Sequence, residues 1–100
     1  MIVVRNVFQI QFGKAKEAVG MFKEGIGIAA RVGGAAKSMR LLTDVTGPFY
    51  TLVLEVTHES LSDFERGAAT LMGSNEWKAW YPKAVALCTG GYREILTVHE

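Results

Sequence analysis

The first segment of the chain, residues 2–12, alternates along its length in a way that predicts a β-strand. One row of this segment would contain Ile2, Val4, Asn6, Phe8, Ile10 and Phe12, and the other Val3, Arg5, Val7, Gln9 and Gln11. Side chains of a strand point alternately to opposite faces, so the first, more apolar row should face helices. The amide of Asn6 falls in this core-facing row. Because the second row still carries valines, we expect both faces of the strand to be covered.

The hydrophobic period then becomes helical between residues 14 and 32 and stops at two glycines, Gly33 and Gly34. Residues 36–45 and 49–57 predict two strands joined by a turn over 46–48. A second helical region begins near Ser60, is interrupted at Gly73, and ends at 89–91. Within it, Ser74 should cap a new segment, and Pro82 should kink or restart the helix. The last strand is predicted over 92–99.

Three glycines, Gly20, Gly25 and Gly27, lie inside the first helix, where each costs roughly 1 kcal/mol relative to alanine. Two explanations stay open at this point. The glycines allow close packing of the helix on the sheet, or they leave room for a ligand between helix and sheet.

The element order β-α-β-β-α-β predicts a single ferredoxin-like α+β domain over residues 1–100, with an antiparallel four-stranded sheet and both helical regions on one face. Right-handed crossovers give the sheet order fourth, first, third and second strand, so the segment 2–12 is central.

The helix-free face of this sheet is predicted to be apolar and to be covered by a second copy of the chain, which gives a homodimer. Across strands, Arg5 should approach Glu55 and Arg93 and form a charge cluster inside that interface; alternatively, the register separates them and each reaches solvent. The residues predicted for this face are Val3, Arg5, Val7, Phe49, Thr51, Val53, Glu55, Arg93, Ile95 and Thr97.

Composition narrows the classes of partner. Apolar residues make up 49% of the chain and the net charge is +1, which does not favour nucleic acid or a membrane surface as a partner. Cys88 is the only cysteine, so an intramolecular disulfide is excluded, and a cytoplasmic location is expected. No apolar run approaches the ~20 residues of a membrane helix.

Candidate chemistry is concentrated in one amide and a set of aromatic residues. A buried unpaired amide costs about 1–3 kcal/mol, so Asn6 either bonds a helix backbone group or water, or it orients a ligand carbonyl or dioxygen. An apolar pocket for a small flat ligand is one interpretation of the aromatic set, and core or dimer-edge packing is the other. The candidate ligand-binding residues are Phe22, Tyr50, Phe64, Trp77 and Trp80, and the candidate catalytic residues are Asn6 and Tyr81.

The sequence predicts no metal site and no bound cofactor. His58 and His99 lack the close spacing of metal ligands: His58 is expected where the second helical region begins, and His99 in solvent. Residues 25–30 match G-x-G-x-x-A, but the match is rejected because it lies inside a helix instead of directly after a strand.

The opening residues 1–14, the segment Ser74-Asn-Glu-Trp-Lys-Ala-Trp-Tyr81 and the ending Gly-Tyr-Arg-Glu-Ile95 resemble the dimeric α+β barrel superfamily, in particular its antibiotic-biosynthesis-monooxygenase and NIPSNAP-like groups. The resemblance implies a homodimeric barrel with a pocket between helices and sheet in each protomer. Some members oxidise polycyclic aromatic compounds with O₂ and without metal or flavin, and others degrade haem. In the haem-degrading branch an asparagine matches Asn6, but Leu71 stands at the tryptophan position and Tyr81 at the position of the axial histidine.

These observations leave three hypotheses for function. The first is a cofactor-independent monooxygenase-like enzyme acting on a small aromatic or polyketide-type compound. The second is a non-catalytic dimeric protein that binds a small molecule or serves as an accessory. The third is a haem-degrading monooxygenase.

Overall fold

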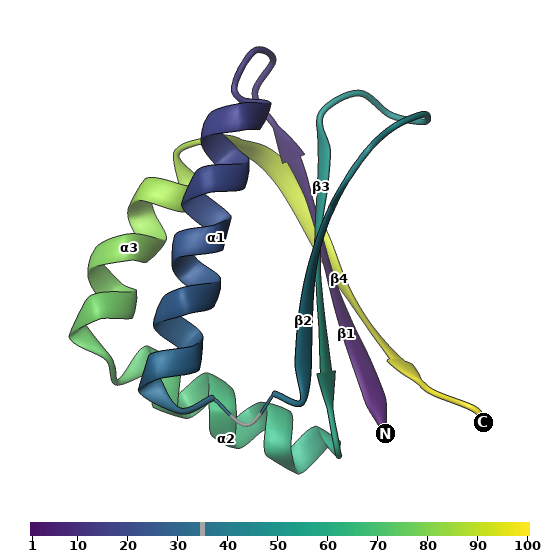
Figure 1. Ribbon diagram of the computed structural model, residues 1–100, viewed down its shortest axis with the longest axis vertical. Helices are drawn as coiled ribbons and strands as arrows, with labels where there is room; N and C mark the ends of the chain where they lie inside the picture. The colour runs from purple at the N-terminus through teal and green to yellow at the C-terminus, as the bar shows by residue number, and fades with distance from the viewer. Residues whose placement is uncertain (35) are drawn as a thin grey trace.

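The structure is a computed structural model that describes residues 1–34 and 36–100. In these residues the order predicted from the sequence is confirmed, with the second helical region divided in two (Figure 1). The elements are β1 (Ile2–Ile10), α1 (Ala15–Val32), β2 (Ser38–Thr43), β3 (Thr51–His58), α2 (Leu61–Met72), α3 (Asn75–Val85) and β4 (Cys88–Thr97).

The described strands form one antiparallel sheet with the order β2-β3-β1-β4, as predicted. Central strand β1 pairs with β3 and β4, so that Val4 lies between Val56 and Ile95. The buried, helix-facing row of β1 includes Val4, which is 1% exposed, and Ile10, which is 2% exposed. The strand that is apolar on both faces therefore lies in the middle of the sheet.

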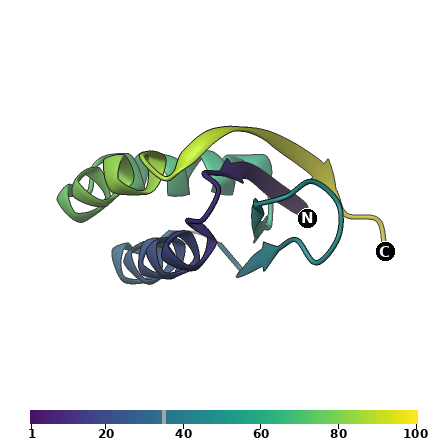
Figure 2. The same ribbon diagram turned by 90° about the horizontal axis from the view of Figure 1, so that it is seen from above.

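The helices lie on one side of the sheet and leave its other side bare (Figure 1). Helices α1 and α3 stand side by side, and α2 crosses beneath them toward the end of β3 (Figures 1 and 2). The main buried core lies between the sheet and helices α1 and α3 and contains Ile10, Ala18, Phe22, Ile28, Leu52, Trp80, Ala84 and Leu87. Among the described residues, no helix is long and apolar enough to cross a membrane.

The predicted helix starts at Ser60 and Ser74 are confirmed, and of the kink or restart expected at Pro82 the restart does not occur. Ser60 Oγ accepts a hydrogen bond from the Asp63 amide at 3.2 Å, and Ser74 Oγ accepts one from the Trp77 amide at 3.3 Å. Both serines therefore cap a helix by satisfying a free N–H of its first turn. Helix α3 runs through Pro82 to Val85 without a new start.

Several strand boundaries differ from the prediction. Strand β1 ends at Ile10, so Phe12, predicted in its core-facing row, lies outside the strand and is 75% exposed, and β2 spans only Ser38–Thr43. Strand β3 begins at Thr51 instead of Phe49, because Tyr50 takes a left-handed backbone conformation with φ 58°. Strand β4 begins at Cys88, so the glycines expected to end the helix lie inside the strand. Gly91 suits this position, because a Cβ there would stand 2.5 Å from the Val7 carbonyl oxygen.

The face assigned to β4 from the sequence was wrong by one residue. Arg93 pairs with Asn6, and Ile95 pairs with Val4, which places both on the helix side of the sheet. The residue that pairs with Arg5 is Glu94. Both rows of β4 mix charged and apolar residues, so alternation alone could not decide the face, and a shift of one residue exchanges the two rows.

A charged cluster does cross the helix-free face, with Glu94 in the place predicted for Arg93. Arg5 Nε lies 3.4 Å from Glu55 Oε2, and Arg5 Nη1 lies 3.0 Å from Glu94 Oε1. Arg40 Nη2 lies 2.6 Å from Glu55 Oε1. The register aligns these residues side by side, and we call this row, Arg40-Glu55-Arg5-Glu94, the charge ladder.

Candidate functional site

A cleft of about 740 Å³ separates the sheet from the helices. Its sheet wall comes from the helix-facing rows of β1, β3 and β4, including Val4, Leu54 and Val56. The other walls come from α1, α2 and α3.

The helix side of the cleft carries a continuous series of aromatic rings. Phe22 meets Trp80 edge-on with centroids 5.8 Å apart, and Trp80 lies 4.7 Å from Trp77. Tyr81 continues the series at 6.5 Å from Trp77 and is 54% exposed. These rings offer a flat ligand both stacking surfaces and edges.

Trp80 is the most firmly held of these rings. Its Nε1 donates a hydrogen bond to the Met21 carbonyl at 2.8 Å, and the side chain is only 5% exposed. Gly25 of α1 lies directly against its six-membered ring, since a Cβ on Gly25 would stand 2.6 Å from Trp80 Cη2. Gly25 thus packs against α3, whereas a Cβ on Gly20 would have no atom within 4 Å.

The sheet wall of the cleft carries a polar pair, Asn6 and Arg93. Asn6 Nδ2 donates to the Leu54 carbonyl at 3.3 Å, and Asn6 Oδ1 accepts from Arg93 Nε at 2.7 Å. The Arg93 guanidinium lies over the Phe64 ring, 5.4 Å from its centroid. Asn6 therefore bonds a sheet carbonyl and an arginine, and not the helix backbone group that was one of the alternatives drawn from the sequence. An amide nitrogen carries two hydrogens, so the second one is available to a ligand.

The titratable side chains that line the cleft include cations but no carboxylate among the described residues. Arg93 and Lys78 contribute positive charge, and no Asp or Glu occurs among its described lining residues. His58 ends β3 as a lining residue only 5% exposed and packs edge-on to Phe64 at 5.5 Å, deeper than the position expected for it. Burial raises the pKa of the Cys88 thiol, another lining residue, so the neutral thiol is favoured.

All but one of the candidate residues chosen from the sequence line this cleft. Tyr50 is the exception: it stacks on Phe12 with centroids 4.8 Å apart and is not a lining residue. Arg93 and His58 were missed as candidates, and for Arg93 the cause was the assignment of β4 to the wrong face. The candidates that line the cleft are Asn6, Phe22, Phe64, Trp77, Trp80 and Tyr81.

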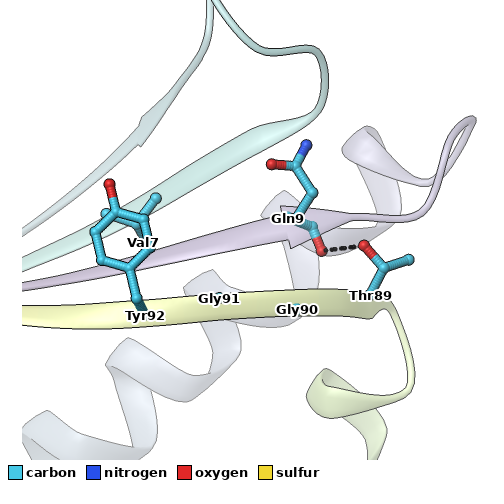
Figure 3. Close-up of a pocket in the computed structure, with 6 residues that line it drawn as sticks. All are labelled: Val7, Gln9, Thr89, Gly90, Gly91 and Tyr92. Carbon is cyan, nitrogen blue, oxygen red and sulfur yellow. Dashed lines mark hydrogen bonds between the residues drawn. The ribbon is translucent and has the colours of Figure 1, made fainter.

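A second hollow, of about 320 Å³, lies on the helix-free face between β1 and β4 (Figure 3). Val7, Gln9, Thr89 and Tyr92 surround it, and Thr89 Oγ1 donates to the Gln9 carbonyl at 3.3 Å. The Gln9 side chain also donates to the Tyr50 carbonyl at 3.3 Å. No charged side chain lines this hollow among the described residues, and it offers less than the cleft for ligand chemistry.

The described residues contain no group of three or more His, Cys, Asp or Glu side chains placed to hold a metal ion. Leu71 and Tyr81, which the sequence resemblance to the haem-degrading branch aligned with a tryptophan and a histidine, both line the cleft. A phenol can ligate ferric haem, but apolar Leu71 cannot supply the indole of that branch.

Comparison with solved structures identifies the fold. An uncharacterised NIPSNAP domain protein from Burkholderia xenovorans superposes with a TM-score of 0.88 at 21% identity, covering 99% of this chain and 95% of that one. The fold is that of the NIPSNAP domain proteins. A second protein from the same organism, described as NIPSNAP-like, has a TM-score of 0.83 at 26% identity and covers 98% and 84% of the two chains.

The NIPSNAP-type fold also extends to an oxygenase. A variant of SnoaB, a cofactor-independent oxygenase from Streptomyces nogalater, superposes with a TM-score of 0.76 at 18% identity, over 99% of this chain and 93% of that one. No family model and no curated protein sequence matches the chain. The resemblance noted in the sequence is thus confirmed by structural likeness.

Proposed function

We propose that this chain binds a small flat aromatic or polyketide-type compound in the cleft and oxidises it as a cofactor-independent monooxygenase. The observation that carries the proposal is the pairing of an aromatic wall with the polar pair Asn6 and Arg93 on the facing sheet. A mostly apolar pocket with a few convergent polar groups is the usual form of a site for such ligands. The likeness of the fold to SnoaB supports the same reaction class.

In the proposed reaction the substrate supplies the electrons. A ring methylene is oxidised to a carbonyl by O₂, with one oxygen atom entering the product and the other leaving as water with the two methylene hydrogens. The spare N–H of Asn6 and the Arg93 guanidinium would stabilise the enolate that forms when the methylene loses a proton. Tyr81 would hydrogen-bond the substrate, and Trp77 and Trp80 would orient its ring plane.

A second function, ligand binding without catalysis, is favoured by one observation. The cleft has no Asp or Glu among its described lining residues, so the common carboxylate base for removing a carbon-bound proton is lacking there. In this alternative the cleft carries or senses the same flat compounds. Turnover distinguishes the two functions.

Oxygen uptake with an anthrone as substrate tests the proposed reaction, measured against the uncatalysed background. We expect uptake that depends on enzyme concentration, with a quinone as product. Asn6→Ala should lower kcat by about tenfold or more, because it removes a donor to the developing oxyanion. Asn75→Ala, which changes an exposed asparagine outside the cleft, should leave kcat unchanged. Uptake no faster than background with a range of anthrones and quinols would leave only the binding function.

We also propose that two copies pair through the helix-free sheet face. In the single chain this face leaves Tyr92 61% exposed, Leu96 45% exposed and Leu42 37% exposed. Covering apolar surface gains about 25 cal/mol per Å², and an isologous pair covers the same surface on both copies. The charge ladder alternates in sign across the face, so it could meet a second ladder with little net repulsion.

A further inference from the structure

Arg93 differs from every other arginine of the chain in its bonding partner. Arg5, Arg31, Arg40 and Arg66 each form an ion pair with a carboxylate. Arg93 instead donates its Nε to the neutral amide of Asn6, and none of the ion pairs among the described residues includes Arg93. Its positive charge therefore remains uncompensated by the protein.

The position of Arg93 directs this charge at the cleft. Asn6, which is itself bonded to the Leu54 carbonyl, fixes the Nε, and the Phe64 ring supports the guanidinium plane. A guanidinium has five N–H donors, and its terminal nitrogens form a fork that matches the two oxygens of a carboxylate. With Nε engaged by Asn6, Nη1 and Nη2 stay available to a ligand.

The remaining lining residues agree with an anionic ligand. Lys78 adds a second cation, and none of the described lining residues is acidic, although the whole chain has 10 acidic residues to 11 basic ones. The cleft is therefore more positive than the chain as a whole. An apolar ligand bearing one negative group would use both its aromatic wall and its cations.

We infer that the compound bound in the cleft carries a carboxylate on its flat ring system, and that Arg93 binds this carboxylate through its terminal nitrogens. The inference rests on the proposed function only in placing the ligand in the same cleft. It makes Arg93 the residue that selects acids over neutral ring compounds. Asn6 then also acts as a positioning residue, because it orients the guanidinium.

Binding of matched probes tests this selection without turnover. The probes are an anthracene carboxylate and the anthracene carboxamide substituted at the same ring position. Both tryptophans of the chain line the cleft, so quenching of intrinsic fluorescence reports binding there. We expect the carboxylate to bind at least about tenfold more tightly than the carboxamide, and added salt to reduce this preference, because hydrogen bonds between charged groups exceed neutral ones.

Variants locate the preference on Arg93. Arg93→Gln should weaken carboxylate binding about tenfold and leave carboxamide binding within about twofold, because only the charged hydrogen bonds are lost. Arg93→Lys should recover part of the affinity, since it restores the charge but not the fork. Arg31→Gln removes the same charge from an exposed arginine outside the cleft and should change neither affinity.

Two results would overturn the inference. One is equal affinity for carboxylate and carboxamide in the unmodified chain, and the other is an equal loss for both probes in Arg93→Gln, which would mean that Arg93 only supports the wall. Selective binding without oxygen uptake would reject the oxygenase function and retain the inference. Equal oxidation rates for acidic and neutral anthrones, with equal probe affinities, would retain the oxygenase function and reject the inference that Arg93 selects a carboxylate.

Discussion

Replacement of Gly25 by alanine tests the packing that forms the helix side of the cleft. An added Cβ would stand 2.6 Å from Trp80 Cη2 and 2.7 Å from Cε2, and nearer still to Cζ2. These atoms belong to a rigid ring that is 5% exposed and tied to the Met21 carbonyl. The ring cannot rotate away as the end of a flexible side chain would, so either α1 and α3 separate or Trp80 leaves its place.

The expected loss follows from two opposing terms. Alanine gains about 1 kcal/mol over glycine inside a helix, whereas overpacking costs typically 1–3 kcal/mol and displacement of a buried tryptophan approaches 3–5 kcal/mol. We therefore expect Gly25→Ala to lower the free energy of unfolding by about 2 kcal/mol. In a domain of this size that lowers Tm by roughly 8–16 °C.

Gly20→Ala is the matched control in the same helix. Gly20 is exposed, and an added Cβ would have no atom within 4 Å, so the free energy of unfolding should rise by up to about 1 kcal/mol. Chemical denaturation followed by far-ultraviolet circular dichroism, at one fixed protein concentration, measures both variants. The reasoning is refuted if Gly25→Ala is as stable as the unmodified chain, or if both variants change by the same amount.

Three further predictions concern the helix-free face and haem. Val3→Asp should convert a dimer to a monomer at micromolar concentration in analytical ultracentrifugation, whereas Val45→Asp, at a 97% exposed position, should not; a monomeric unmodified chain would reject the pairing. The hydrogen bond from Arg40 holds the pKa of Glu55 below its ordinary value of 4.5. Its contribution to stability is therefore present above about pH 4.5 and lost as pH falls through the lower folded pKa, so Glu55→Gln should flatten acid unfolding in this range. Stoichiometric haem should produce no Soret shift, because Leu71 and Tyr81 stand where the sequence resemblance to the haem-degrading branch would place a tryptophan and a histidine; a shift abolished by Tyr81→Phe would contradict this.

The strand order could be predicted from the sequence because hydrophobic alternation was clear in β1, the central strand. In β1 the row containing Val4 and Ile10 is consistently more apolar than the row containing Arg5 and Gln9, so the central strand and its buried face could be assigned. The caps at Ser60 and Ser74 were equally predictable, since each depends on a local hydrogen bond.

The face of β4, the start of β3 and the packing around Gly25 could not be predicted, because hydrophobic alternation carries no information about them. The face of β4 was ambiguous because Arg93 and Glu94 are both charged, and only pairing with β1 decides between them. Tyr50 left the predicted strand through a left-handed backbone conformation that its residue type does not signal. The space around Gly25 depended on where α3 places Trp80, which is a tertiary contact between residues far apart in the sequence.

The pairing of β1 with β4 places two different polar functions one residue apart. Asn6 and Arg93 face the cleft, while the adjacent residues Arg5 and Glu94 face the opposite side within the charge ladder. Because neighbouring strand residues alternate between faces, a slip of β4 by one residue in one direction would place Glu94 opposite Asn6, and a slip in the other direction would place Arg93 opposite Arg5. The first slip would give the cleft a negative charge, and the second would place two positive charges side by side on the opposite face. The ion pair between Arg5 and Glu94 therefore favours the register in which Arg93 supplies its charge to the cleft, so the chemistry of the cleft depends on the opposite face of the sheet.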